Sequence, residues 1–192
     1  MAFFPFTKDK WREFMKSLLQ AGVIALCIRT YLVQAYKIPS SSMENTLKPG
    51  DHIFVNKFLY GIRIPYTEKR LLAWRSPKRL DIMVFQAPHE PQKDYIKRCI
   101  GLPGDSLKVE DMKVFANGSG LEEPYTRYNQ GYPHRDAIHP QPDPIPEKSF
   151  FMMGDNRDNS KDSRYWGYLP MRNVKGKALF IYWPPRRIGI IR

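Results

Sequence analysis

Cysteine is scarce in this chain, which has only Cys27 and Cys99 among its 192 residues. Cys27 lies in an apolar N-terminal segment and Cys99 lies far along the chain, so we expect no disulfide between them. Neither has the Cys-x-x-Cys spacing of a redox or metal site. The four histidines lie singly in turn-like contexts: His52, His89, His134 and His139. The sequence therefore predicts no metal site.

Acidic residues are the minority charge. The chain has 19 Asp and Glu against 31 Lys and Arg, which gives a formal net charge of +12. Such a charge suits nucleic acid, an anionic lipid surface or an acidic partner. Most aromatic residues stand in strand-like patterns rather than interleaved with a basic patch, so we expect membrane lipid rather than nucleic acid as a partner.

The chain also lacks a long uninterrupted apolar run. Its most hydrophobic stretch, residues 18–28, is shorter than the roughly 20 residues that cross a bilayer. Arg29 at its end can extend its charge to an interface. Three aromatic residues of the kind found at membrane interfaces flank the stretch: Trp11, Phe14 and Tyr31. We therefore expect residues 14–34 to form one transmembrane helix.

Basic residues before the hydrophobic stretch 18–28 indicate the orientation of the helix and are expected to stay cytoplasmic: Lys8, Lys10, Arg12 and Lys16. Two alternatives stay open for the segment. One is a cleavable secretory signal, because Val33-Gln34-Ala35 offers small residues at a suitable spacing. The other is a buried amphipathic helix. Cleavage at that point would free the body only a few residues before its serine-rich turn, which argues against the first alternative.

Short strand-like runs bounded by Pro, Gly and Asp follow Tyr36: residues 52–56, 81–85, 95–100, 149–153 and 177–183. Residues 106–109 and 113–116 flank a turn and predict a hairpin. Alternate prolines then predict an extended arm: Pro140, Pro142, Pro144 and Pro146.

The predicted fold is mostly β. An antiparallel β-sheet catalytic core is expected over residues 36–105 and 149–192, with a small inserted β cap over residues 106–148. A cytoplasmic tip and the membrane anchor, residues 1–35, precede it.

Two segments suggest nucleophilic catalysis. Ser40-Ser41-Ser42 forms a serine-rich turn after the apolar segment, and Lys97 stands in an apolar strand where alternation can turn it inward and Arg98 the other way. A serine hydroxyl becomes a good nucleophile when a base removes its proton, and a lysine made neutral by burial can be that base. Taken alone, the turn would be an ordinary helix cap and the lysine a surface residue of an edge strand.

Three motifs, in this order, resemble those of bacterial type I signal peptidases: I-P-S-x-S-M-x-x-T-L from Ile38, D-Y-I-K-R-x-I-G-L-P-G-D from Asp94, and M-G-D-N-R-D-N-S-x-D-S-R-Y-W-G from Met153. The family usually has glycine where Ser41 stands. The resemblance implies that Ser42 is the nucleophile, Lys97 its base and Ser40 a donor to the oxyanion. It also makes Ser160 the hydroxyl that orients the Lys97 amine, with three residues in support: Asp155, Asp162 and Arg164.

The resemblance further implies a shallow apolar groove that receives small side chains at the first and third positions before the cut. Six positions match those that line this groove in the family: Tyr36, Ile38, Met43, Leu47, Tyr95 and Ile96. Discrimination there would be steric. For any one of these residues the alternative is plain core packing.

The implied function is a membrane-bound serine endopeptidase that removes N-terminal signal peptides from exported preproteins after Ala-x-Ala-type residues. It would need no cofactor, and would be single-pass in the cytoplasmic (inner) membrane with its catalytic domain on the extracytoplasmic face, near the protein-export translocon. One alternative is another Ser-Lys peptidase, such as a conjugation-pilus processing enzyme or a self-cleaving repressor, although DNA-binding helices are lacking. The other is a non-catalytic membrane-attached binding module, which the intact Ser42 and Lys97 weigh against.

Overall fold

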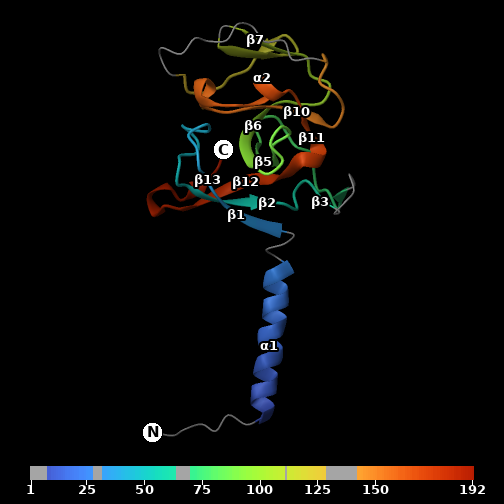
Figure 1. The fold of residues 1–192 in the computed structure, drawn as a ribbon, viewed down its shortest axis with the longest axis vertical. Coiled ribbons are helices and arrows are strands. Elements are labelled where there is room, and N and C mark those ends of the chain that lie inside the picture. Colours follow the sequence, from blue (N-terminus) through green and yellow to red (C-terminus); the bar gives the residue numbers. More distant parts are fainter. Residues whose placement is uncertain (1–7, 28–31, 64–69, 111, 129–141) are drawn as a thin grey trace.

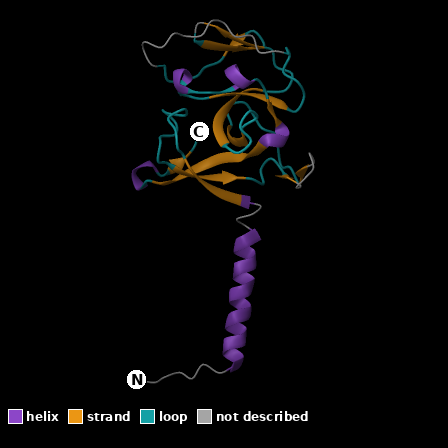
Figure 2. Ribbon diagram, viewed as in Figure 1, coloured by secondary structure: helices purple, strands orange, loops and turns teal. Residues whose placement is uncertain are grey.

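The structure is a computed structural model that describes residues 8–27, 32–63, 70–110, 112–128 and 142–192. Helix α1 (Lys8–Cys27) is followed by a body made mainly of strands. Figure 1 shows α1 projecting from one end of this body, and Figure 2 shows that strands and loops make up most of the rest. The prediction of a mostly β fold is confirmed.

An eight-stranded sheet forms the centre of the body, in the order β1-β2-β12-β5-β6-β10-β11, with β13 paired to β12. Each of these pairings is antiparallel, as predicted. The strands span β1 (Val33–Lys37), β2 (His52–Asn56), β5 (Ile82–Gln86), β6 (Asp94–Gly101), β10 (Ser149–Met153), β11 (Leu169–Pro170), β12 (Val174–Trp183) and β13 (Gly189–Ile190).

The strands predicted over residues 52–56 and 149–153 coincide with β2 and β10, and those over 81–85 and 95–100 differ from β5 and β6 by one residue at each end. β12 begins three residues before the predicted 177–183. Its extra residues pair with β5, where Val174 lies opposite Phe85. A local apolar pattern does not reveal such a partner.

Two smaller sheets flank the large one. β7 (Leu107–Glu110), β8 (Lys113–Ala116) and β9 (Ser119–Gly120) form a three-stranded sheet at the end of the body away from α1 (Figure 1). β7 and β8 confirm the predicted hairpin, whereas β9 was not predicted. The second sheet, β3 (Ile62–Arg63) with β4 (Arg70–Leu71), was also not predicted. Pro140, in the predicted arm, lies outside the described residues, and the domain boundaries stay predictions.

Four short helical turns complete the body: η2 (Arg157–Asn159), α2 (Ser163–Trp166), η3 (Met171–Asn173) and η4 (Pro185–Arg187). The largest contribution to packing comes from apolar side chains on both faces of the main sheet. One group joins Met43 and Leu47, both fully buried, to Ile53 and Val55 of β2. Burial of each such side chain stabilises the fold by roughly 1.5–3 kcal/mol. The turn between β1 and β2 is thereby fixed to the sheet.

Helix α1 is not packed into the body. Its apolar side chains are largely exposed, including Leu19 at 70% and Leu26 at 65%, so the alternative of a buried core helix is wrong. Among the described residues, we find no helix that combines the length and the hydrophobicity needed to cross a membrane. Residues 28–31, inside the expected span of 14–34, lie outside the described residues, and the transmembrane helix stays a prediction.

The close approach of β12 to β2 gives a test of the packing. A Cβ atom on Gly176 would lie 2.3 Å from the backbone oxygen of Asn56, so Gly176→Ala must push the two strands apart. We expect a loss of about 1–3 kcal/mol in the free energy of unfolding, measured by urea denaturation of the full-length protein in detergent. Gly189→Ala is the matched control, because its Cβ would meet nothing within 4 Å. Equal stability of the two variants would contradict the packing described here.

Candidate active site

Ser42 lies in the turn between β1 and β2, residues 38–47, which we call the serine turn. Its neighbour Met43 and the later Leu47 are fully buried, and the Leu47 backbone N–H donates to the Met43 carbonyl over 2.7 Å. These two anchors hold Ser42 at the surface of the core with only 8% of its area exposed. The turn therefore presents the Ser42 hydroxyl from a fixed backbone.

Lys97 approaches Ser42 from β6. Its Nζ donates to Ser42 Oγ over 2.6 Å and to the Ile96 carbonyl over 3.1 Å. The side chain points inward, as the strand alternation predicted, and only 4% of the residue is exposed. The structure thus brings together the two residues that the sequence singled out for nucleophile and base.

Burial lowers the pKa of Lys97 from 10.5 to about 8, because an ammonium group loses hydration when it is enclosed. The carboxylates of Asp162 and Asp155 raise this pKa, and the guanidinium of Arg164 lowers it. Burial has the largest effect. A substantial fraction of the amine is therefore neutral at mildly alkaline pH, and the neutral amine can accept the Ser42 proton.

Ser40 and Ser160 are the two other serines assigned to the site. The Ser40 hydroxyl is 3.4 Å from Ser42 Oγ. Ser160 Oγ is buried and has no hydrogen-bond partner among the described residues, and no hydrogen bond joins it to Lys97 in that part of the chain. A Cβ atom on Gly154 would lie 2.2 Å from Ser160 Oγ and 2.5 Å from the Ser42 carbonyl oxygen. Glycine at 154 thus allows both serines to approach the same backbone.

Asp162 is paired with Arg164. Arg164 Nε donates to one Asp162 oxygen over 2.8 Å, and its second nitrogen donates to the other over 2.9 Å. The same carboxylate accepts the Gly154 backbone N–H over 3.0 Å. Asp162 therefore holds the backbone at Gly154, beside Ser42, while its charge is shared with Arg164.

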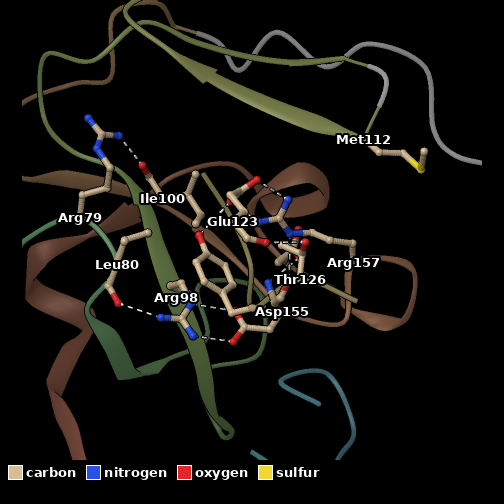
Figure 3. Close-up of polar contacts among 12 residues, drawn as sticks. Arg79, Leu80, Arg98, Ile100, Met112, Glu123, Thr126, Asp155 and Arg157 are labelled. Carbon is tan, nitrogen blue, oxygen red and sulfur yellow. Dashed lines mark hydrogen bonds and ion pairs between the residues drawn. The ribbon is translucent and has the colours of Figure 1, made fainter. Parts of the chain in front are cut away.

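Asp155 forms a second, fully buried pair with Arg98, which donates to its two oxygens over 2.9 and 2.7 Å. Figure 3 shows the Arg98 guanidinium between the Asp155 carboxylate and the Leu80 carbonyl. Thr46 of the serine turn donates to the same carboxylate over 2.5 Å. Sequence alternation correctly predicted that Arg98 faces away from Lys97, but it gave no sign that Arg98 is itself buried.

Residues 121–128 were missed as part of the site. Arg127 donates its backbone N–H to the Asp155 carbonyl over 2.7 Å, and its side chain pairs with Glu44 of the serine turn at 3.0 Å. Glu123 forms an ion pair with Arg157, which is also drawn in Figure 3. This segment therefore contacts both loops that carry the candidate serines. Its tyrosines and charges, spread through an irregular stretch, gave no local signal for this role.

A cleft with a volume of about 450 Å³ opens beside the Ser42–Lys97 pair. Its lining consists of Pro39, Ser40, Ser42, Lys93, Asp94, Tyr95, Ile96, Lys97, Asn159 and Lys161. One side of this lining comes from the serine turn and the other from the start of β6. The β6 side is extended backbone, which suits a peptide in extended conformation.

The predicted groove residues divide into two sets. Tyr95 and Ile96 line the cleft. Ile38, Met43 and Leu47 belong to the core cluster under the serine turn, and Tyr36 packs against that cluster while its hydroxyl donates to Asp94 over 3.2 Å. These four are absent from the cleft lining, and Ile38, Met43 and Leu47 make core contacts; their role in a groove stays a prediction. No cluster of His, Cys, Asp and Glu suited to a metal ion occurs in the described parts of the chain.

A protein-family model described as "Signal peptidase, peptidase S26" matches residues 11–183. This chain belongs to that family. It is therefore a peptidase, and the buried Ser42–Lys97 pair lies within the matched region. The recognition made from the three motifs is confirmed.

Individual relatives agree with the family match. Signal peptidase I of Pseudomonas aeruginosa is 39% identical over 92% of this chain and 75% of that protein. Signal peptidase I of Leptolyngbya laminosa is 37% identical over 92% of this chain and 82% of that protein. A crystal structure of a signal peptidase I from Enterococcus faecalis aligns with 54% of this chain and 97% of that chain, at 30% identity and a TM-score of 0.44.

Proposed function

We propose that the protein is a serine endopeptidase that removes N-terminal signal peptides from exported preproteins, with Ser42 as nucleophile and Lys97 as general base. The observation that carries the proposal is the 2.6 Å contact between Lys97 Nζ and Ser42 Oγ, buried beside an open cleft. Family membership supports the substrate class. A non-catalytic binding module would have no need for a lysine kept partly neutral by burial.

The reaction follows from the contacts of the pair. Neutral Lys97 accepts the Ser42 proton while Ser42 Oγ attacks the scissile carbonyl carbon, and a tetrahedral oxyanion forms. Lys97 returns the proton to the leaving amine, which departs as the new N-terminus and leaves an ester on Ser42. A water molecule, deprotonated by Lys97, then hydrolyses this ester and releases the signal peptide.

Six neighbouring side chains support these steps in the proposal. The Ser40 hydroxyl, 3.4 Å from Ser42 Oγ, is close enough to donate to the oxyanion. The buried Ser160 hydroxyl has its hydrogen-bonding capacity free among the described residues, which suits the role of orienting the Lys97 amine. Asp162 with Arg164, and Asp155 through Arg98, hold the loop in place while their charges are shared with arginine.

Substrate selection is assigned to the cleft. Tyr95 and Ile96 form an apolar wall next to the dyad, and a large side chain beside the scissile bond would meet this wall. We therefore propose cleavage after small residues at the first and third positions before the cut, as in Ala-x-Ala. Tyr36, Ile38, Met43 and Leu47 shape the wall from behind through the core cluster.

Membrane attachment is proposed through α1 and the residues that follow it. The exposed side chains of α1 include Leu18, Leu19, Val23, Ile24 and Leu26, and water is an unfavourable solvent for such a surface. In the proposal residues 14–34 cross the cytoplasmic membrane, with the basic N-terminal residues inside and the β body on the extracytoplasmic face, near the translocon that delivers preproteins. Lipid is then the partner of α1.

Replacement of the dyad tests the catalytic assignment. Ser42→Ala and Lys97→Ala are each expected to lower kcat/KM by a factor on the order of 10⁴ or more, because nucleophile and base act as a unit. Lys97→Arg should fail equally, since arginine keeps its proton near neutrality. Cleavage of a model preprotein on a gel measures the loss. Lys108→Arg, a lysine change in β7, is the matched control and should keep full activity; near-normal turnover by Lys97→Arg would rule out the proposed base.

The pH dependence tests the protonation state of Lys97. The reaction needs the neutral amine, and its fraction increases as the pH rises through the pKa of about 8. Activity should therefore increase from pH 6 to a plateau above about pH 9, with the acidic limb of kcat/KM near pH 8 rather than near 10.5. Replacement of His89, the histidine nearest the cleft lining in sequence, should leave this limb unchanged. If the acidic limb disappeared in that variant, the assignment of Lys97 as the base would be wrong.

Truncation tests the attachment. A protein that lacks residues 1–31 keeps β1 whole and every proposed catalytic residue, so it should leave the membrane fraction yet still cut a soluble peptide with an Ala-x-Ala site. The full-length chain should resist extraction by alkaline carbonate. Protease added outside the cytoplasmic membrane should reach the body. Complete release of the full-length chain by carbonate, or full protection of the body, would contradict the anchor.

A further inference from the structure

The serine turn contains one side chain that the proposed chemistry does not use. Ser41 stands between Ser40 and Ser42. Its backbone φ is not in the left-handed region, in contrast to Asn45 later in the turn, so the conformation at 41 does not require glycine. The half-buried Ser41 hydroxyl therefore adds a contact without a cost in backbone strain.

Besides the hydrogen bond from Thr46 to Asp155, three hydrogen bonds connect Ser41 and Ser42 of the serine turn with residues 154–160. Asn156 donates its backbone N–H to the Ser42 carbonyl over 3.1 Å, and its side-chain amide donates to the Ser41 carbonyl over 3.1 Å. The third runs from Asn159 Nδ2 to Ser41 Oγ over 2.8 Å. The first two reach backbone atoms that any residue provides. The third needs a hydroxyl at position 41, and glycine cannot form it.

The third hydrogen bond joins two residues that each adjoin a residue of the proposed site. Ser41 directly precedes the nucleophile, and Asn159 directly precedes Ser160 and lines the cleft. The absence of a side chain at Gly154 lets the two loops approach here, because a Cβ atom would lie within 2.5 Å of the Ser42 carbonyl oxygen. A change in the separation of the loops would therefore move Ser42 relative to Lys97, which is held on β6.

We propose that Ser41 and Asn159 are positioning residues that fix the separation of the serine turn from the 154–160 loop and so keep Ser42 Oγ in hydrogen-bonding distance of Lys97. This inference rests on the proposed function of Ser42 and Lys97. The free energy of one side-chain hydrogen bond corresponds to about a 3-fold to 10-fold change in rate when the bond is needed for the reactive geometry. Loss of either partner should lower kcat by that factor.

The pH profile gives a second readout. The charged groups that influence Lys97 are Asp162, Asp155 and Arg164 of the adjacent loop, and its direct contacts are the Ser42 hydroxyl and the Ile96 carbonyl. If the serine turn moves away from this loop, water reaches the amine and its pKa rises toward the ordinary value. The acidic limb of the rate profile should then move to higher pH. A contact that only stabilises the fold would leave the limb in place.

A double-mutant cycle tests the inference in the full-length protein. We would measure kcat, KM and the acidic limb for Ser41→Ala, Asn159→Ala and the double variant with a soluble Ala-x-Ala peptide. Each single change should lower kcat by about 3-fold to 10-fold with KM little changed, and the double variant should be no slower than the singles. Ser41→Thr keeps the hydroxyl and should restore kcat. Ser41→Gly should behave as Ser41→Ala does.

Ser106→Ala is the matched control. It removes an exposed serine hydrogen bond of similar length, 2.9 Å to Asp143, just before β7, and should change neither kcat nor the pH limb. Wild-type kcat and limb in the two single variants would overturn the inference, as would additive losses or a KM effect confined to Asn159→Ala. Ser42→Ala, measured in parallel, separates the two proposals. Activity in that variant overturns the proposed function. If Ser42→Ala is inactive while the Ser41 variants keep the wild-type kcat and pH limb, the positioning role alone is overturned.

Discussion

The enclosure of Lys97 is the constraint on which the arrangement around it depends. An amine that must accept a proton has to lose hydration, and the β6 position with 4% exposure provides this. Nearby carboxylates oppose it, since each stabilises the ammonium form. The acids of the adjacent loop are therefore paired elsewhere: Asp155 with Arg98 and Asp162 with Arg164. These ion pairs hold the loop backbone beside Ser42 without placing a carboxylate in contact with the lysine.

Alternation along β6 places a lysine that must become neutral and an arginine that stays charged at adjacent positions of one strand. Lys97 faces Ser42, and Arg98 faces the Asp155 carboxylate, although the two residues are adjacent and both are buried. A strand is suited to this because successive side chains point to opposite sides of the sheet. A buried arginine is stable only with a full set of partners, and Arg98 donates to Asp155, to Thr46 and to the Leu80 carbonyl. The charge that would disturb Lys97 is thus neutralised on the far face of the same strand.

Local patterns in the sequence were sufficient for the elements that depend on neighbouring residues. Apolar alternation and Pro, Gly and Asp boundaries located β2, β5, β6 and β10 to within a residue at each end, and the three motifs identified the family. Features that depend on contacts between distant residues could not be predicted from local patterns. The short strands β3, β4 and β9 exist through their partners, and the apolar pattern at Met43 and Leu47 is equally compatible with a groove and with the core. Residues 121–128 have no regular pattern, yet they join the serine turn to the Asp155 loop.

The convergence on Asp155 explains why these distant segments matter to one another. Its side chain binds Thr46 and Arg98, and its backbone carbonyl accepts the Arg127 N–H. Arg127 in turn pairs with Glu44, two residues beyond the nucleophile. Removal of Arg98 would leave the buried Asp155 carboxylate without its ion-pair partner, which costs more than the net contribution of a single hydrogen bond. Three segments that are far apart in the sequence are therefore held as a unit around Ser42. Residues 121–128, which follow the three-stranded sheet, are in this way structurally coupled to the turn that carries the proposed nucleophile.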